Sequence, residues 1–142
     1  MLLAWAVSCD SYELREDGTA NIYAAGFDTF RVESLPAELE LSVLLRFLLI
    51  EDEASDLEVY VLGPDTAPLG NLAFPIKADP GPEHRPGYLV SQIEALNLTF
   101  LAEREGVHSV ELYADHDPEN PTAEEHRRSI FFNVRRGLPE QD

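Results

Sequence analysis

Apolar and polar residues alternate with a period of two along most of the chain, and the alternation is clearest over residues 38–49. One parity of that run is wholly apolar and consists of Leu39, Leu41, Val43, Leu45, Phe47 and Leu49. The other parity holds Glu38, Glu40, Ser42 and Arg46, together with Leu44 and Leu48. Because successive side chains of a strand point to opposite faces, this pattern predicts a strand with one buried face and a second face that is half covered toward its end. Leu-rich runs also have good helix propensity, but strict alternation directly after Pro36 favours the strand.

Shorter alternating runs predict further strands, at residues 3–9, 22–32, 57–62, 71–76, 95–101, 107–114 and 129–134. Turn signals separate them: Asp17-Gly18 predicts a tight turn, and the Pro-rich stretch 77–87 predicts a long irregular connection. Gly26 indicates a bend inside its run, and Pro75 is typical of an edge strand. The segment "SQIEAL", residues 91–96, could form one helical turn at most.

These runs predict about eight short strands and no amphipathic helix. The fold class expected from them is all-β: a single-domain antiparallel β-sandwich of about 7–9 strands, immunoglobulin-like or C2-like. At 142 residues the chain has the length of one ordinary domain. We expect the sandwich to span residues 1–136 and a flexible tail to follow over residues 137–142.

The charge balance restricts the partners of the protein. The chain holds 27 acidic and 10 basic residues and has a formal net charge of −17, which repels nucleic acids and anionic lipid. The first residues lack the basic segment of a signal peptide, and no apolar run reaches the length of a membrane span. With its single cysteine, Cys9, the chain cannot form an internal disulfide. We therefore expect a cytoplasmic protein that binds neither nucleic acid nor membrane.

The densest cluster of titratable residues lies between the last two predicted strands. Its candidate metal ligands are Asp115, His116, Asp117, Glu124, Glu125 and His126. If the flanking strands pair as a hairpin, the two acidic groups face each other across its mouth; carboxylates suit Ca²⁺ or Mg²⁺, and the histidines suit Zn²⁺. A structural interpretation competes with this divalent-cation site. Asp117-Pro118 and Asn120-Pro121 are turn dipeptides, and Thr122 with Glu125 forms a helix-capping box.

No other motif indicates chemistry. The sequence holds no Gly-rich phosphate loop, no GxSxG and no HExxH. Cys9 is expected to be a small core residue, and His84 and His108 are expected to be structural or exposed. The acidic stretch of residues 51–58 is expected to solvate a loop between two strands, although a Ca²⁺ site or a basic partner there is the alternative. The sequence therefore predicts that the protein is not an enzyme and holds no resident cofactor.

The order of several stretches resembles an uncharacterised bacterial β-sandwich family. The resemblance rests on "SCDS" followed by "DGTANIYAAGFDTFRV", on "SLPAELELSVLLRF" leading to "EVYVLGPDTAPLG", and on "LTFLAEREGVHSVELYADH". It spans nearly the whole chain and implies a sandwich fold without catalytic residues. Where the family has a brief turn before its last strand, this chain inserts "DPENPTAEEHRR".

Two functions are consistent with these features. The first is a non-catalytic binding or accessory module that contacts a protein partner or forms a homo-oligomer; apolar residues on both parities of residues 44–49 favour such an interface. The second is a calcium-type metal-binding sandwich that uses the loop before its last strand.

Overall fold

The computed structural model describes residues 1–26, 28–114 and 127–137, and its regular elements are strands apart from one short 3₁₀ turn. These elements are β1 (Leu2–Cys9), β2 (Ser11–Leu14), β3 (Ala20–Tyr23), β4 (Thr29–Val32), β5 (Ala37–Leu49), β6 (Ala54–Leu62), η1 (Pro64–Thr66), β7 (Pro68–Lys77), β8 (Val90–Ala102), β9 (Gly106–Ala114) and β10 (Arg127–Arg136). The predicted all-β class is confirmed. Within the described ranges, no helix is long and apolar enough to cross a membrane.

The described strands number ten, more than the sequence predicted. The run at residues 22–32 divides into β3 and β4, because the chain turns at Ala24 and Gly26, which both have positive φ angles. Residues 11–14, which were not predicted as a strand, form β2 and pair with β3 around the expected turn at Gly18. The tail expected from residue 137 begins with an ordered contact, since the Gly137 amide donates to the Val32 carbonyl over 2.9 Å.

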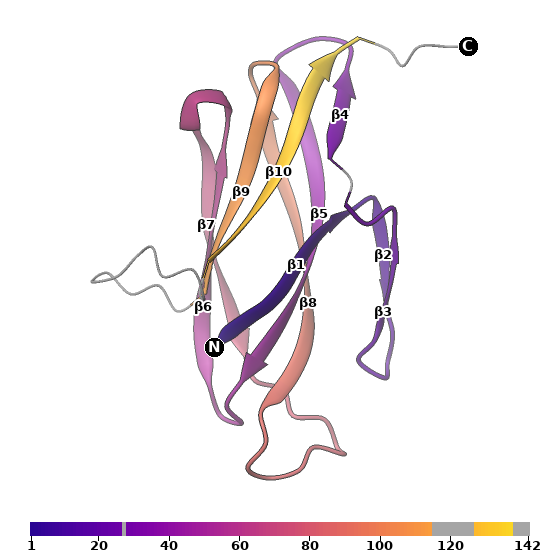
Figure 1. Cartoon of the computed structure of the whole chain (residues 1–142), viewed down its shortest axis with the longest axis vertical. Coiled ribbons are helices and arrows are strands. Elements are labelled where there is room, and N and C mark those ends of the chain that lie inside the picture. Colours follow the sequence, from indigo (N-terminus) through magenta and orange to yellow (C-terminus); the bar gives the residue numbers. More distant parts are fainter. Residues whose placement is uncertain (27, 115–126, 138–142) are drawn as a thin grey trace.

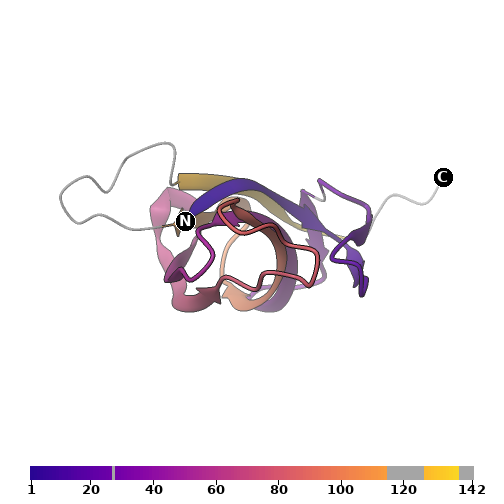
Figure 2. The same cartoon turned by 90° about the horizontal axis from the view of Figure 1, so that it is seen from below.

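The strands form three sheets, in the orders β1-β5-β8, β4-β10-β9-β6-β7 and β2-β3. The two larger sheets curve around a common interior in a sandwich-like arrangement, and β1 lies beside β10 at one of their junctions (Figures 1 and 2). The β2–β3 hairpin stands to one side of this body (Figure 1). The pairing is not purely antiparallel as predicted, because β4 runs parallel to β10. A parallel pair needs a long crossover connection, and most of the chain lies between these two strands.

The interior is filled by one parity of each long strand. The six apolar residues that the alternation of β5 placed on one face are buried, with exposed fractions between 0% and 9%. Leu44, on the opposite parity, is also fully buried, and its neighbours in the sheet are Val7 of β1 and Ala95 of β8. Leu48 is half-buried. The prediction of a half-covered second face is therefore confirmed.

An aromatic cluster joins the two large sheets at one end of the interior. Phe132 of β10 lies at its centre, with ring centroids 5.6 Å from Phe30, 5.5 Å from Phe100 and 5.3 Å from His108. Phe30 and Phe100 also meet edge to face at 6.5 Å. Because these rings come from four strands of both sheets, the cluster fixes how the sheets lie against each other.

Replacing Phe132 by Ala should lower the free energy of unfolding by about 3–5 kcal/mol, because a large side chain is removed from a closed core. The neighbouring Phe131 provides a matched control: its side chain is 63% exposed, so Phe131→Ala should change stability by less than about 0.5 kcal/mol. Urea unfolding of both variants measures the difference. Equal losses in the two variants would contradict the assignment of Phe132 to the core.

Candidate functional site

The six residues predicted as metal ligands, Asp115, His116, Asp117, Glu124, Glu125 and His126, lie outside the described residues. The flanking strands do pair as an antiparallel hairpin, with Tyr113 opposite Arg127. Among the described residues, no group of three or more His, Cys, Asp or Glu side chains could hold a metal ion. The metal site in the loop between β9 and β10 thus stays a prediction.

His108 belongs to the interior. Its side chain is buried and stacks on Phe132, and its Nδ1 lies 2.9 Å from the Gly106 carbonyl oxygen. A carbonyl only accepts hydrogen bonds, so Nδ1 carries the ring proton. Nε2 is buried and has no hydrogen-bond partner among the described residues. The side chain of this histidine thus packs as part of the aromatic cluster.

Cys9 is likewise a structural residue. Its side chain is buried, and the pKa of the thiol is raised, first by burial and then by the nearby charge of Asp10. Both effects keep the sulfur protonated, which is unfavourable for a nucleophile.

Polar side chains on the outer face of the larger sheet form a cluster in which Glu111 is bound by Ser129 and Arg127. Glu111 is only 7% exposed; it accepts a hydrogen bond from the Ser129 hydroxyl, and its carboxylate lies 3.6 Å from the Arg127 guanidinium. The Tyr60 and Tyr113 rings meet edge to face beside it, and Arg127 lies 5.9 Å from the centre of the Tyr113 ring. The acid already has a cation and a hydroxyl donor, so this cluster stabilises the sheet.

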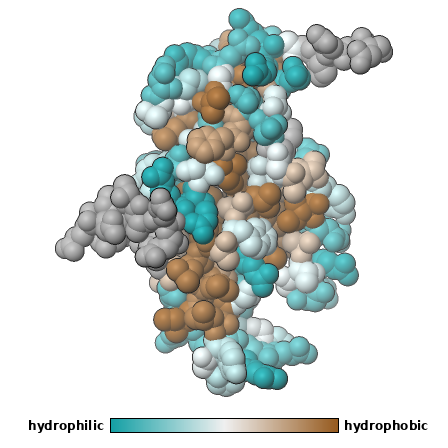
Figure 3. Space-filling model, in the orientation of Figure 1, coloured by the Kyte–Doolittle hydropathy of each residue, from teal (hydrophilic) through white to brown (hydrophobic). Residues whose placement is uncertain are grey.

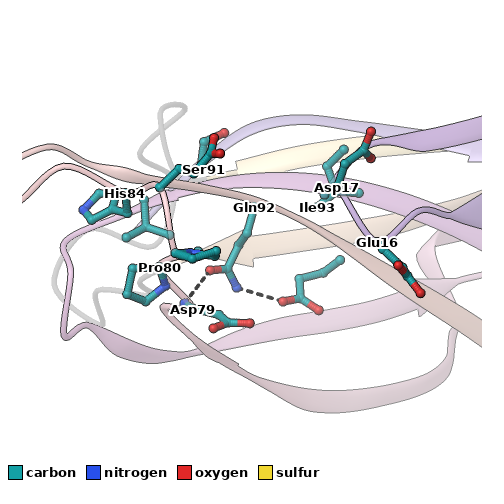
Figure 4. A pocket seen from close by; sticks show the side chains of 14 residues that line it. Glu16, Asp17, Asp79, Pro80, His84, Ser91, Gln92 and Ile93 are labelled. Atoms are coloured by element: carbon teal, nitrogen blue, oxygen red, sulfur yellow. Dashed lines mark hydrogen bonds between the residues drawn. The ribbon is translucent and has the colours of Figure 1, made fainter.

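The feature best suited to receive a ligand is a recess beside β8 (Figure 4). It lies between the turn of the β2–β3 hairpin and the connection from β7 to β8, and its volume is about 770 Å³. Its lining comes from three segments: residues 16–18, residues 79–84 and residues 90–94. Five consecutive residues of β8 alternate between the two faces of the sheet. The recess therefore runs along the edge of β8 rather than over one face.

Gln92 orders the inner wall of the recess. Its amide nitrogen donates to the Lys77 carbonyl over 3.0 Å and to the Glu94 carboxylate over 2.8 Å, while its oxygen accepts from the Asp79 amide over 2.9 Å (Figure 4). The bonds to Lys77 and Asp79 join β8 to the end of β7 and to the start of the connection that borders the recess, and the bond to Glu94 lies within β8. One side chain thus sets the geometry of this wall.

The recess is strongly negative. Five carboxylates line it, from Glu16, Asp17, Asp79, Glu83 and Glu94, and no Lys or Arg is among the described lining residues. The pKa of Asp17 is lowered, chiefly by hydrogen bonds from the Thr19 hydroxyl and amide, so this group is fully ionised near neutral pH. A concave site with one sign of charge attracts positively charged groups.

Glu51 holds the connection that forms the other border of the recess. One of its carboxylate oxygens accepts a hydrogen bond from the Gly87 amide and lies 3.1 Å from Nε2 of His84. The Gly87 amide and then His84 lower the pKa of Glu51. Nearby, the Glu53 carboxylate accepts from the Ile50 amide over 3.1 Å. The expectation that residues 51–58 only solvate a loop was therefore incomplete, because residues 54–58 belong to β6 and a third acid, Glu58, accepts a hydrogen bond from the Tyr60 hydroxyl over 3.1 Å.

Large exposed apolar side chains are spread over several elements. They are Leu2, Leu14, Tyr23, Ile50, Leu72, Tyr88, Leu89, Leu101, Val107 and Phe131. On the face that Figure 3 shows, apolar areas are interrupted by polar ones. Single exposed apolar residues are normal on protein surfaces and do not identify an interface.

Comparison with known proteins adds no functional assignment: no protein-family model matches the chain, and no curated protein matches it. The recess is thus characterised by its own geometry and charge.

The contact of Glu51 should depend on pH in a defined direction. Its pKa is lowered from the ordinary value of 4.5, so the stabilising contact is present above pH 4.5 and is lost as the pH falls through the lowered pKa. We expect the Gly87 amide to be protected from hydrogen exchange at pH 6 and to lose that protection in strong acid. Glu51→Ala should lower the protection at pH 6 by a factor on the order of five and should remove its dependence on pH.

The exposed neighbour Asp52 supplies the control for this measurement. Asp52→Ala also removes one carboxylate without touching the Gly87 contact and should leave the protection factor unchanged. Equal protection of Gly87 in the wild-type protein and in Glu51→Ala would show that Glu51 does not hold the connection.

Proposed function

We propose that the protein is a non-catalytic binding module that holds a segment of a partner protein in the recess beside β8. The observation that carries this proposal is the recess itself, a negative groove with an ordered wall between two loops. Its lining combines acids, one histidine, a glutamine and apolar residues. This composition suits recognition of a polar peptide and lacks a nucleophile paired with a base.

The proposed frame of the module is an antiparallel β-sandwich of the immunoglobulin or C2 type, with β4 as a parallel addition. Such sandwiches commonly use the loops at their ends for binding. The hairpin turn and the β7–β8 connection act in this way here. The resemblance to an uncharacterised bacterial β-sandwich family agrees with an accessory role, and the single cysteine agrees with action in the cytoplasm.

The charge of the chain favours a different protein over a second copy as the partner. With a formal net charge of −17, two copies repel each other, whereas a basic partner is attracted and steered toward the negative groove. Nucleic acids and anionic membranes are repelled by the same field.

A selection from a library of displayed random peptides tests the proposed function. The wild-type protein should enrich binders, and the double variant Asp79→Lys with Glu83→Lys should bind them at least about tenfold more weakly, because like charges then meet in the groove. Both replaced side chains are exposed, so the fold should tolerate the changes. Binding constants are measured by calorimetry at fixed salt.

The matched control is Glu38→Lys with Glu40→Lys. These residues are also exposed and change the net charge equally, but they lie opposite Leu101 and Thr99, away from the part of β8 that lines the recess. The proposed function fails if no peptide is enriched, or if both double variants weaken binding to the same extent.

A further inference from the structure

β8 is a long edge strand. Its thirteen residues pair with β5 along their whole length, from Val90 opposite Leu49 to Ala102 opposite Ala37. Among the described residues, no strand pairs with its other side through backbone hydrogen bonds, although the end of β7 lies near its first residues, where the Gln92 side chain donates to the Lys77 carbonyl. An edge strand points alternate backbone N–H and C=O groups away from its partner, and these groups form a template for one more strand.

The other edges of the two large sheets are shorter or less regular. β7 contains Pro68, Gly70 and Pro75, which interrupt strand pairing. β4 has four residues, and the outer side of β1 lies beside β10 (Figures 1 and 2). β8 contains no Pro, Gly or Lys and only one charged residue, Glu94. It therefore lacks the devices that usually prevent edge-to-edge pairing.

The recess opens onto this unpaired edge. The residues of β8 that line it form an uninterrupted stretch, Val90–Glu94, which spans roughly 17 Å in an extended conformation. This length fits an extended segment of about five residues. The same five residues of β8 thus line the negative recess and offer backbone groups at the edge of the sheet.

A peptide segment that paired with this edge as a further strand would meet acidic side chains on both of its faces. On one face, the hairpin covers β8, since Asn97 donates to the Tyr12 hydroxyl over 2.9 Å, and the turn of this hairpin brings Glu16 and Asp17 to the recess. On the other face, Gln92 bonds to the amide of Asp79. Figure 4 places Glu16 and Asp17 to one side of Gln92 and Asp79 to the other. Side chains that alternate along a strand can reach both groups of carboxylates.

We propose that an extended, lysine- or arginine-rich segment of a partner protein adds to the free edge of β8 as a further strand. Its backbone pairs with Val90–Glu94, and its basic side chains lie among the carboxylates of the recess. This inference rests on the proposed function and names the kind of segment that the groove receives. Backbone pairing supplies affinity, and the acidic borders select for positive charge.

A capped octapeptide in which two lysines alternate with two valines (KKVVKKVV) is the direct probe, because this order puts lysines on both faces of an extended strand. Two-dimensional NMR should show its binding at the amides of β8, and hydrogen exchange at Val90–Glu94 should slow by about tenfold or more when the peptide is saturating. The same peptide with alternate backbone amides N-methylated keeps its charge but cannot form a ladder, so its affinity should fall at least about tenfold. Replacing its lysines by glutamates should abolish binding.

Each outcome separates this inference from the proposed function. If the methylated peptide binds as tightly as the unmodified one, strand addition is wrong, while recognition of a peptide in the recess stands. If peptides selected from the library bind but are not basic, the charge preference is wrong. If β8 amides become protected on raising the protein concentration without any peptide, a second copy occupies the edge and the inference is overturned. If no peptide of any kind binds, the proposed function itself fails.

Discussion

The row of apolar side chains along β5 is the contact on which the rest of the structure depends. Its six inward residues are nearly inaccessible to solvent, and burial of each such side chain stabilises the fold by about 1.5–3 kcal/mol. β5 is also the middle strand of its sheet, so the positions of β1 and β8 follow from its register. A slip of one residue would turn the whole row outward. The recess lies beside Val90–Glu94, which this register places at the edge of the sheet.

The strongest alternation in the sequence predicted the best-defined part of the fold. Residues 38–49 were predicted as a strand and form β5, because a buried face requires an unbroken apolar parity. The first half of β8 was missed for the opposite reason. Gln92 and Glu94 lie on its inward parity, opposite Phe47 and Leu45, yet both are only half-buried because they border the recess. Polar residues are tolerated there, so the apolar period breaks and the segment was interpreted as a helical turn.

The site was harder to predict than the fold, since its parts are far apart in the sequence. Acids and histidines that are close in the sequence form a recognisable pattern, and those between β9 and β10 are the densest such group in the chain. The recess instead combines a hairpin turn, a Pro-rich connection and a strand edge. The Pro-rich connection was predicted correctly as long and irregular. Its fixation by Glu51 through Gly87 and His84 could not be predicted, because nothing in the local sequence relates these residues.

The parallel pair of β4 and β10 has a consequence for how the protein is made. Ribosomes deliver the chain from its N-terminus, so Phe30 emerges early and Phe132 late. β4 pairs with Asn133–Arg136, its strand partner among the described residues, and therefore has to wait until nearly the whole chain has been synthesised. The hairpin β2–β3 and the sheet β1-β5-β8 can assemble before that moment. During translation, Phe30 thus lacks its ring partner Phe132 until β10, the last of the described strands to emerge, completes the sheet that β4 joins.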